Sequence, residues 1–143
     1  MNGETATNIM KLTIITLVDP TEQQYLDLYK IWTDQTRNHV DDLLKSEQKI
    51  YAARFNDRLL GAAKVQINHQ QGIISHFLIR EITRRRGVGL YLLDEICRQQ
   101  PQVTHWLFSL EDVTDTNKNI LIPFLLACGF TETANENQWE KRV

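Results

Sequence analysis

Residues 83–90, T-R-R-R-G-V-G-L, have the composition of a loop that binds a diphosphate. Glycine lets the backbone approach a ligand closely, and the free N–H groups at the start of a following helix point toward that ligand. The positive end of the helix dipole favours an anion at the same place. The guanidinium groups of Arg84, Arg85 and Arg86 add charge and bidentate donors for phosphate oxygens. This chemistry requires a strand before the loop and a helix after it.

Both flanking elements are predicted. Residues 73–80, IISHFLIR, are short and apolar, as in a strand. Residues 88–99 place their apolar side chains on one helical face, and Pro101 follows them. The alternative interpretation is a glycine-rich turn with solvated arginines. The Rossmann pattern would need a third glycine, and the Walker pattern would need G-K-[ST], so neither applies.

The rest of the chain predicts one α/β domain with a mixed sheet. Asp19 is the expected N-cap of the first helix, with Pro20 in the first turn and Glu22 three residues after the cap. Asn56 and Asp57 predict a tight hairpin turn. Further strands are predicted at residues 12–18, 49–55, 59–67 and 105–110, helices at 25–32, 40–44 and 116–127, and a closing hairpin at 130–133 and 138–141.

Composition narrows the function classes. With 143 residues and a net charge of −2, the chain predicts a single domain without general affinity for nucleic acid. No apolar run approaches the roughly 20 residues that span a membrane. Cys97 and Cys128 form no metal-ligand pattern, and we expect reduced core thiols in a cytoplasmic protein. Residues 1–9 are expected to be a disordered leader or upstream extension of a domain over residues 10–143.

Two motifs resemble the GNAT acyltransferases. Residues 84–89 are similar to that fold's loop pattern [RQ]-x-x-G-x-[GA], and residues 126–130, L-A-C-G-F, are similar to the end of its last helix. The resemblance implies a GNAT domain, a mixed central sheet flanked by helices, that binds acetyl-CoA or CoA. It implies that the strand residues Phe77, Leu78 and Ile79 contact the pantetheine arm and that the loop residues Thr83, Arg84, Arg85, Arg86, Gly87, Val88, Gly89 and Leu90 bind the pyrophosphate.

The resemblance to GNAT enzymes is weaker at the positions of their catalytic residues than at the cofactor-binding loop. These enzymes commonly place a carboxylate on the central strands and a tyrosine four residues before the glycine of the last G-F. Here Leu125 occupies the tyrosine position, and residues 66–80 contain no Asp or Glu. His76 and His105 remain candidates for a general base or for structural roles. We therefore predict no catalytic residue and favour a binding protein over an enzyme.

Longer strings resemble the PanM/PanZ family within the GNAT fold. They are residues 50–60, IYAARFNDRLL, residues 80–89, REITRRRGVG, and residues 139–141, WEK. This resemblance implies an acetyl-CoA-binding regulator of aspartate 1-decarboxylase. It would bind the zymogen and the mature enzyme, promote autocleavage to the pyruvoyl form, and mediate CoA-dependent feedback on pantothenate and β-alanine synthesis. Asn56 would contact ligand or partner, or would only form the turn. The alternative is an active N-acetyltransferase on a small amine or a protein N-terminus.

Overall fold

The computed structural model describes residues 11–80 and 87–143. The expected leader and the site residues Thr83, Arg84, Arg85 and Arg86 lie outside the described residues. The elements are β1 (Leu12–Thr16), α2 (Glu22–Ile31), α3 (Arg37–Lys45), β2 (Lys49–Phe55), β3 (Arg58–Asn68), β4 (Gln71–Ile79), α4 (Val88–Gln99), β5 (His105–Ser109), α5 (Asp115–Ala127), β6 (Thr131–Glu132) and β7 (Gln138–Arg142).

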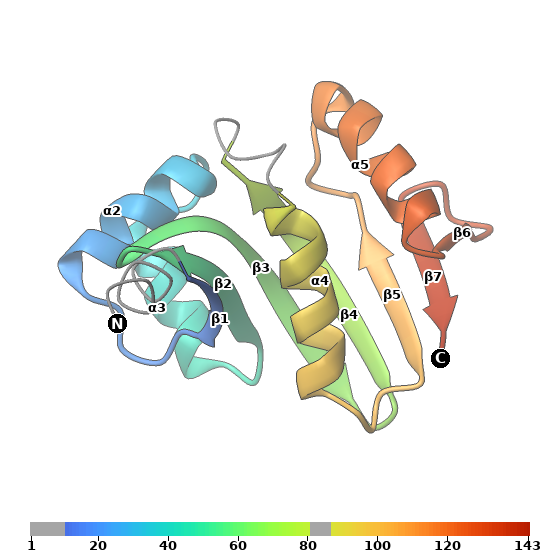
Figure 1. Ribbon diagram of the computed structural model, residues 1–143, viewed down its shortest axis with the longest axis horizontal. Helices are drawn as coiled ribbons and strands as arrows, with labels where there is room; N and C mark the ends of the chain where they lie inside the picture. The colour runs from blue at the N-terminus through green and yellow to red at the C-terminus, as the bar shows by residue number, and fades with distance from the viewer. Residues whose placement is uncertain (1–10, 81–86) are drawn as a thin grey trace, which may run out of the picture.

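One mixed sheet organises the molecule (Figure 1). Its strand order is β1-β2-β3-β4-β5-β7-β6. All neighbouring strands are antiparallel except β4 and β5, which run parallel because α4 crosses over between them. The predicted turn between β2 and β3 is confirmed, since Asn56 and Asp57 have φ values of 51° and 62°. The expected order of elements and the mixed α/β architecture are also confirmed.

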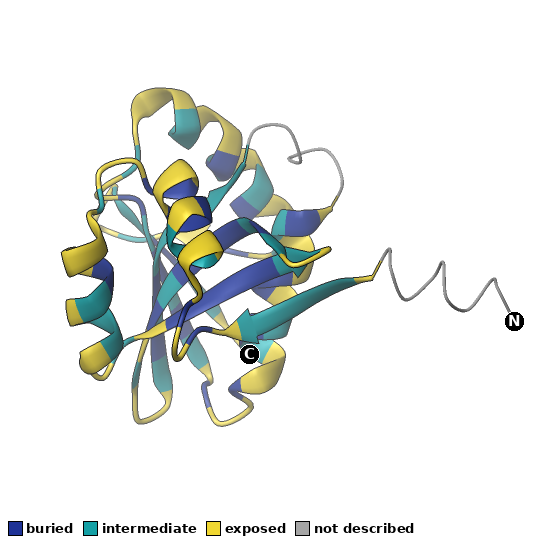
Figure 2. Ribbon diagram, turned by 90° about the vertical axis from the view of Figure 1, so that its left-hand side faces the viewer, coloured by how far each residue is buried: buried dark blue, intermediate teal, exposed yellow. Residues whose placement is uncertain are grey.

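Helices cover both faces of the sheet and form two apolar clusters. The first cluster joins α4 and α5 to one face through residues such as Phe77, Leu92 and Leu125. The second joins α2 and α3 to the other face and contains the fully buried Trp32. Successive side chains of a strand point to opposite faces, so each strand contributes to both clusters. Tyr51 belongs to the first cluster and its neighbour Ala52 to the second. Figure 2 shows the buried central strands between helices whose outer faces are exposed.

The predicted cap of the first helix was wrong. α2 begins after Thr21, whose Oγ1 accepts a hydrogen bond from the Gln24 N–H at 3.1 Å, while Gln24 Oε1 accepts from the Thr21 N–H at 3.0 Å. This reciprocal capping box satisfies two backbone N–H groups at the start of the helix. Thr36 and His39 form the same arrangement at the start of α3, which is longer than the predicted helix.

Two further expectations concern cysteines and membranes. Cys97 and Cys128 are free thiols, partly buried against the α4–α5 cluster and not fully buried. Burial raises the pKa of the Cys97 thiol to about 11, so it is an unreactive thiol at neutral pH. Among residues 11–80 and 87–143, no helix has the length and apolar character needed to cross a membrane.

Candidate cofactor-binding site

The parallel strands β4 and β5 separate at one end. They pair from Gln71 with His105 to Ile74 with Phe108. In the described part of the chain, β4 continues beyond Ile74 without a β5 partner. A bulge accompanies the separation, because His76 and Phe77 of β4 together oppose one residue of β3, Ala63. Since a bulge bends its strand, β4 diverges from β5 beyond this point (Figure 1).

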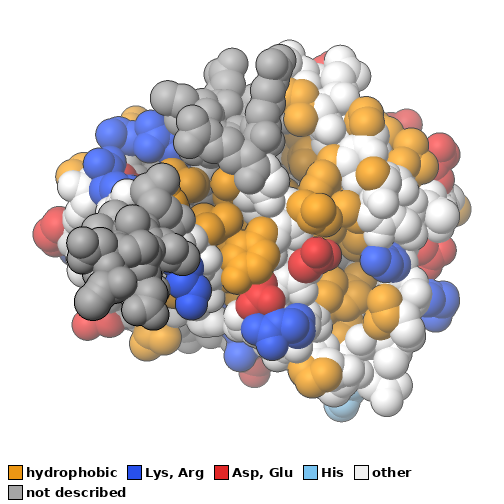
Figure 3. Space-filling view, viewed as in Figure 1, with side chains coloured by type: hydrophobic (Ala, Val, Ile, Leu, Met, Phe, Trp, Pro, Cys, Tyr) orange, Lys and Arg blue, Asp and Glu red, His pale blue; other side chains and the backbone are white. Residues whose placement is uncertain are grey.

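A groove of about 260 Å³ lies against this part of β4. β4, the start of α4 and one side of α5 form its walls, which consist of Phe77, Leu78, Ile79, Gly87, Gly89, Leu90, Asn117, Ile120, Leu121 and Phe124. The rings of Phe77 and Phe124 stack across it with centroids 5.8 Å apart. Figure 3 shows hydrophobic side chains on the face that carries α4 and α5. The groove therefore suits a slender, largely apolar ligand segment.

The start of α4 adds a site for negative charge. Gly87 is the N-cap residue, with φ 73°, and among the described residues no side chain caps the helix. The left-handed conformation at this position favours glycine, since a Cβ would be strained there. The first-turn N–H groups of an α-helix have no intrahelical acceptor, and no side chain of residues 11–80 or 87–143 caps them here. The positive end of the helix dipole therefore faces the groove, beside the predicted diphosphate loop.

Gly89 keeps the groove open between β4 and α5. A Cβ at this position would lie 3.5 Å from Ile79 Cγ1 and 3.7 Å from both Phe124 Cζ and Phe77 Cε1. These are ordinary van der Waals distances, so a methyl group would fit the fold. It would, however, stand among three groove residues, and any longer side chain would fill the space. The backbone conformation thus does not require glycine here, and the missing side chain leaves space in the groove.

One side of α5 is a groove wall that the sequence did not predict. Asn117, Ile120, Leu121 and Phe124 recur at the i, i+3, i+4 and i+7 spacing of one helical face. Asn117 brings a polar amide to a lining that is otherwise apolar over the described residues. The only signal in the sequence is a polar residue at the head of this apolar stripe.

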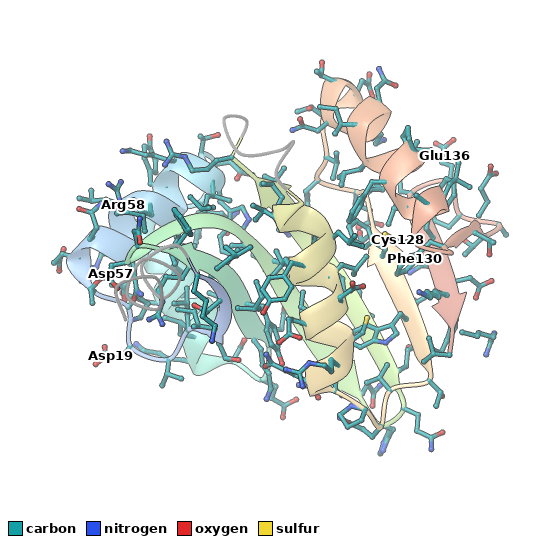
Figure 4. All side chains as sticks on the ribbon, in the orientation of Figure 1. Asp19, Asp57, Arg58, Cys128, Phe130 and Glu136 are labelled. Carbon is teal, nitrogen blue, oxygen red and sulfur yellow. The ribbon has the colours of Figure 1, made fainter. Side chains whose placement is uncertain are left out.

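Six of the predicted ligand residues come together in the groove, namely Phe77, Leu78, Ile79, Gly87, Gly89 and Leu90. Val88 is 2% exposed and packs in the core. Asn56 lies at the exposed turn between β2 and β3 and is absent from the groove lining. Its neighbour Asp57 lies beside α2, on the opposite side of the molecule from α5 (Figure 4).

His76 precedes the groove residue Phe77 in β4 but is not part of the groove lining, and it is poorly placed to act as a base. Its Nε2 lies 3.2 Å from Asp112 Oδ2, and its Nδ1 is buried without a partner among the described residues. Burial lowers the pKa of the imidazole below 6.5, and the charge of Lys64 lowers it further, against the opposing effects of Asp112 and Asp34. The ring is therefore neutral at pH 7, yet neither nitrogen is offered to an amine.

The other residues considered for catalysis have structural contacts. His105 Nε2 lies 2.8 Å from Glu140 Oε1, and its Nδ1 lies 3.2 Å from the Gln71 amide nitrogen. Leu125 is fully buried in the α4–α5 cluster. The arrangement can bind an amphipathic ligand with a negatively charged end, and it offers no acid at position 125.

Comparison with known families gives a match over almost the whole chain. The family model described as "Acetyltransferase (GNAT) domain, PanZ" matches residues 11–140. The chain is 42% identical over 133 residues to the PanD regulatory factor of Salmonella typhimurium, an alignment that covers 93% of this chain and 100% of that protein.

Solved structures agree on the fold. A putative N-acetyl transferase from E. coli bound to coenzyme A superimposes with a TM-score of 0.78 at 40% identity, covering 94% of this chain and 100% of that one. A GNAT family acetyltransferase from Elizabethkingia anophelis with acetyl-CoA bound gives a TM-score of 0.68 at 15% identity, covering 92% and 98%. The domain therefore has the GNAT fold that the sequence predicted.

Proposed function

This chain belongs to the PanZ family of GNAT-fold domains, and on that premise we propose that it binds CoA or acetyl-CoA and regulates PanD, the aspartate 1-decarboxylase. The two relatives that support the ligand are GNAT-fold proteins bound to coenzyme A and to acetyl-CoA. The relative that supports the partner is a PanD regulatory factor.

The observation that carries the proposal is the position of the α4 N-terminus beside the gap between β4 and β5. The helix start favours an anion, and the groove next to it is narrow and apolar. CoA combines a diphosphate with a slender pantetheine arm, which matches this pairing of environments. In the proposed complex, Arg84, Arg85 and Arg86 neutralise the diphosphate, and the arm runs along Phe77 to Ile79.

The proposed regulatory role rests on the residues considered for catalysis, which offer no available general acid or base. Leu125 cannot donate a proton to a leaving thiolate, and the nitrogens of His76 and His105 are occupied or buried. Bound acetyl-CoA then acts as a signal. The protein would promote autocleavage of the PanD zymogen and restrain the mature enzyme when CoA is abundant. It would act in the cytoplasm, where Cys97 and Cys128 stay reduced.

Autocleavage of the purified PanD zymogen tests the role directly. Cleavage is followed by mass spectrometry with zymogen alone, with this protein, with acetyl-CoA, and with both together. We expect acceleration only in the last case, and a Gly89→Leu variant with a filled groove should lose it. Asn119→Ala, on the exposed side of α5, is the matched control. Equal rates in all four mixtures would refute the regulatory role.

An enzymatic role predicts a different result. A panel of small amines and peptides with free N-termini is incubated with the protein and acetyl-CoA, and free thiol is measured. We expect thiol release at the uncatalysed rate throughout. Amine-dependent release that disappears in His76→Ala would instead establish an acetyltransferase.

A further inference from the structure

α2 has two apolar faces. One packs on the sheet through Leu28 and Ile31, which are 1% and 6% exposed. The other, the outer face of α2, consists of Tyr25, Leu26 and Tyr29, and its Leu26 and Tyr29 are 58% and 60% exposed. A helix on the surface of a globular domain needs one apolar stripe for the core and is otherwise polar. Packing within the described part of the chain therefore does not account for the outer face of α2.

A small pocket continues the outer face of α2 toward α3. The buried Leu28 and Val40 and the exposed Leu26 and Tyr29 all line it, and its volume is about 210 Å³. Small-molecule sites usually start at roughly 300 Å³. The pocket is therefore better matched to one large side chain of a partner protein than to a cofactor.

Contacts between α2 and α3 hold one wall of this pocket in place. The Tyr25 hydroxyl donates to Asp41 Oδ1 at 2.5 Å, and the guanidinium of Arg37 lies 4.0 Å from the centre of the Tyr25 ring. Arg37 Nη1 also donates to Glu22 Oε2 at 2.8 Å. Tyr29, one turn further along α2, has no hydrogen bond from its hydroxyl to a described residue. A preformed pocket beside an exposed tyrosine suits a protein interface, because little ordering is needed on binding.

The charge around the outer face of α2 is negative. Residues 19–48, which contain α2 and α3, have seven Asp or Glu side chains and three Lys or Arg side chains, whereas the whole chain has a net charge of only −2. Among the described residues, Asp34, Asp42 and Glu47 are exposed carboxylates of this region. Such a surface attracts a partner segment that carries positive charge.

We infer that the outer face of α2, with the pocket beside it, is a docking surface for PanD and receives an apolar side chain from a basic segment of that protein. This rests on the proposed regulation of PanD. α2 and α3 cover the opposite face of the sheet from α4 and α5, whose residues line the CoA groove (Figure 1). PanD therefore docks on α2 while the groove stays available for acetyl-CoA.

Calorimetric binding of the PanD zymogen to the full chain, saturated with acetyl-CoA, tests this assignment. Leu26→Ala/Tyr29→Ala truncates two exposed side chains, so the double variant should fold and keep the wild-type affinity for acetyl-CoA. Because the two side chains anchor the interface, the variant should bind PanD at least about tenfold more weakly. Leu126→Ala is the matched control, since Leu126 is 57% exposed on α5 and outside the groove lining, and it should bind PanD as wild type does.

The positive charge of the partner segment is tested separately. Asp34→Asn/Asp42→Asn should weaken PanD binding by about threefold or more at low salt, and high salt should reduce the difference from wild type. Glu136→Gln, in the exposed turn before β7, is the control and should have no effect. Wild-type affinity in the acidic double variant, or an equal loss in the control, overturns the basic segment as the occupant.

The remaining outcomes separate this inference from the proposed function. Wild-type affinity for PanD in Leu26→Ala/Tyr29→Ala, or an equal loss in Leu126→Ala, overturns the docking surface while the regulatory role stands. Sedimentation velocity of the protein alone should show a monomer. A dimer that dissociates in Leu26→Ala/Tyr29→Ala would assign the face to a second copy of this chain and would also overturn the inference. Failure of wild type to bind PanD with acetyl-CoA present overturns the inference and the proposed function together.

Discussion

The guanidinium of Arg58 encloses the buried carboxylate of Asp27. Its Nε donates to both carboxylate oxygens, at 3.0 and 3.1 Å, and its Nη2 donates to Oδ1 at 2.7 Å. Asp27 also accepts from the Leu59 N–H at 2.9 Å. Burial alone would raise the pKa of Asp27, but these bonds and one from Gln23 hold it below 3.8. The pair joins α2 to the start of β3, next to the turn that carries Asn56 (Figure 4).

Asp27→Ala should lower the free energy of unfolding by about 3 kcal/mol. Removing one member of a buried ion pair leaves its partners unsatisfied, here Arg58 and the Leu59 N–H. The expected loss is at the lower limit for such pairs because the Arg58 side chain is 44% exposed and therefore remains partly solvated without Asp27. Urea unfolding followed by circular dichroism measures it.

The exposed pair Arg37–Glu22 provides the control. Its nitrogen–oxygen distance is 2.8 Å, but the side chains are 52% and 78% exposed. Water screens such a pair, so Glu22→Gln should change the free energy of unfolding far less than Asp27→Ala does. Similar losses in the two variants would mean that burial does not distinguish the two pairs.

Gly89→Ala and Gly89→Leu should separate ligand binding from folding. The alanine variant should keep or gain stability, up to about 1 kcal/mol, because alanine favours helix over glycine and its Cβ makes ordinary contacts. The leucine side chain should fill the groove and weaken CoA binding by at least about tenfold, or 1.4 kcal/mol. Calorimetry measures affinity, and thermal unfolding checks the fold. Normal affinity in Gly89→Leu would exclude this groove as the CoA site.

Gly87→Ala, unlike Gly89→Ala, should lower the stability of the fold. The Cβ would meet no atom of the described residues within 4 Å, but the φ of 73° is strained for any residue other than glycine. We expect a loss of about 1 kcal/mol in the free energy of unfolding. Stability equal to wild type would mean that α4 starts elsewhere.

Local patterns predicted most of the fold. The helix over 88–99 and the strand over 49–55 have the predicted bounds, because apolar spacing and flanking turn residues define them within the chain. The first helix cap was wrong for a local reason as well. Asp19 with Glu22 and Thr21 with Gln24 have the same capping-box spacing, so the local pattern fits both positions, and in the structure Thr21 and Gln24 form the box.

Tertiary contacts determined what the sequence could not reveal. The left-handed backbone of His76 depends on Trp32, 44 residues earlier in the chain, and no local signal marks the bulge. The burial of Asp27 depends on Arg58, 31 residues away. Asn117 becomes a groove residue only because α5 packs beside the gap between β4 and β5. The glycines and the strand residues of the groove were predictable, since their motif is continuous in sequence.

Asn117→Ala should weaken CoA binding by about fivefold. An amide that bonds to a ligand contributes about 1 kcal/mol, and Asn117 is the polar side chain of the described groove lining. Asn119→Ala changes the same residue type two positions later, on an exposed part of α5, and should leave the affinity at the wild-type value. Parallel effects in the two variants would show that α5 stability, and not a ligand contact, is responsible.

The free energy of unfolding should decrease as the pH is lowered, because His76 titrates. Burial and then Lys64 lower the pKa of the folded imidazole below 6.5, opposed by Asp112 and Asp34. As the pH falls below 6.5, His76 becomes protonated in the unfolded chain while it is still largely neutral in the folded chain. The free energy of unfolding therefore decreases. His76→Gln removes this effect, and Asp112→Asn enlarges it by removing a charge that supports the imidazolium. Urea unfolding at pH 7.5 and 5.5 measures the slopes, above the range in which Asp27 titrates. Identical slopes in wild type and His76→Gln would refute the lowered pKa.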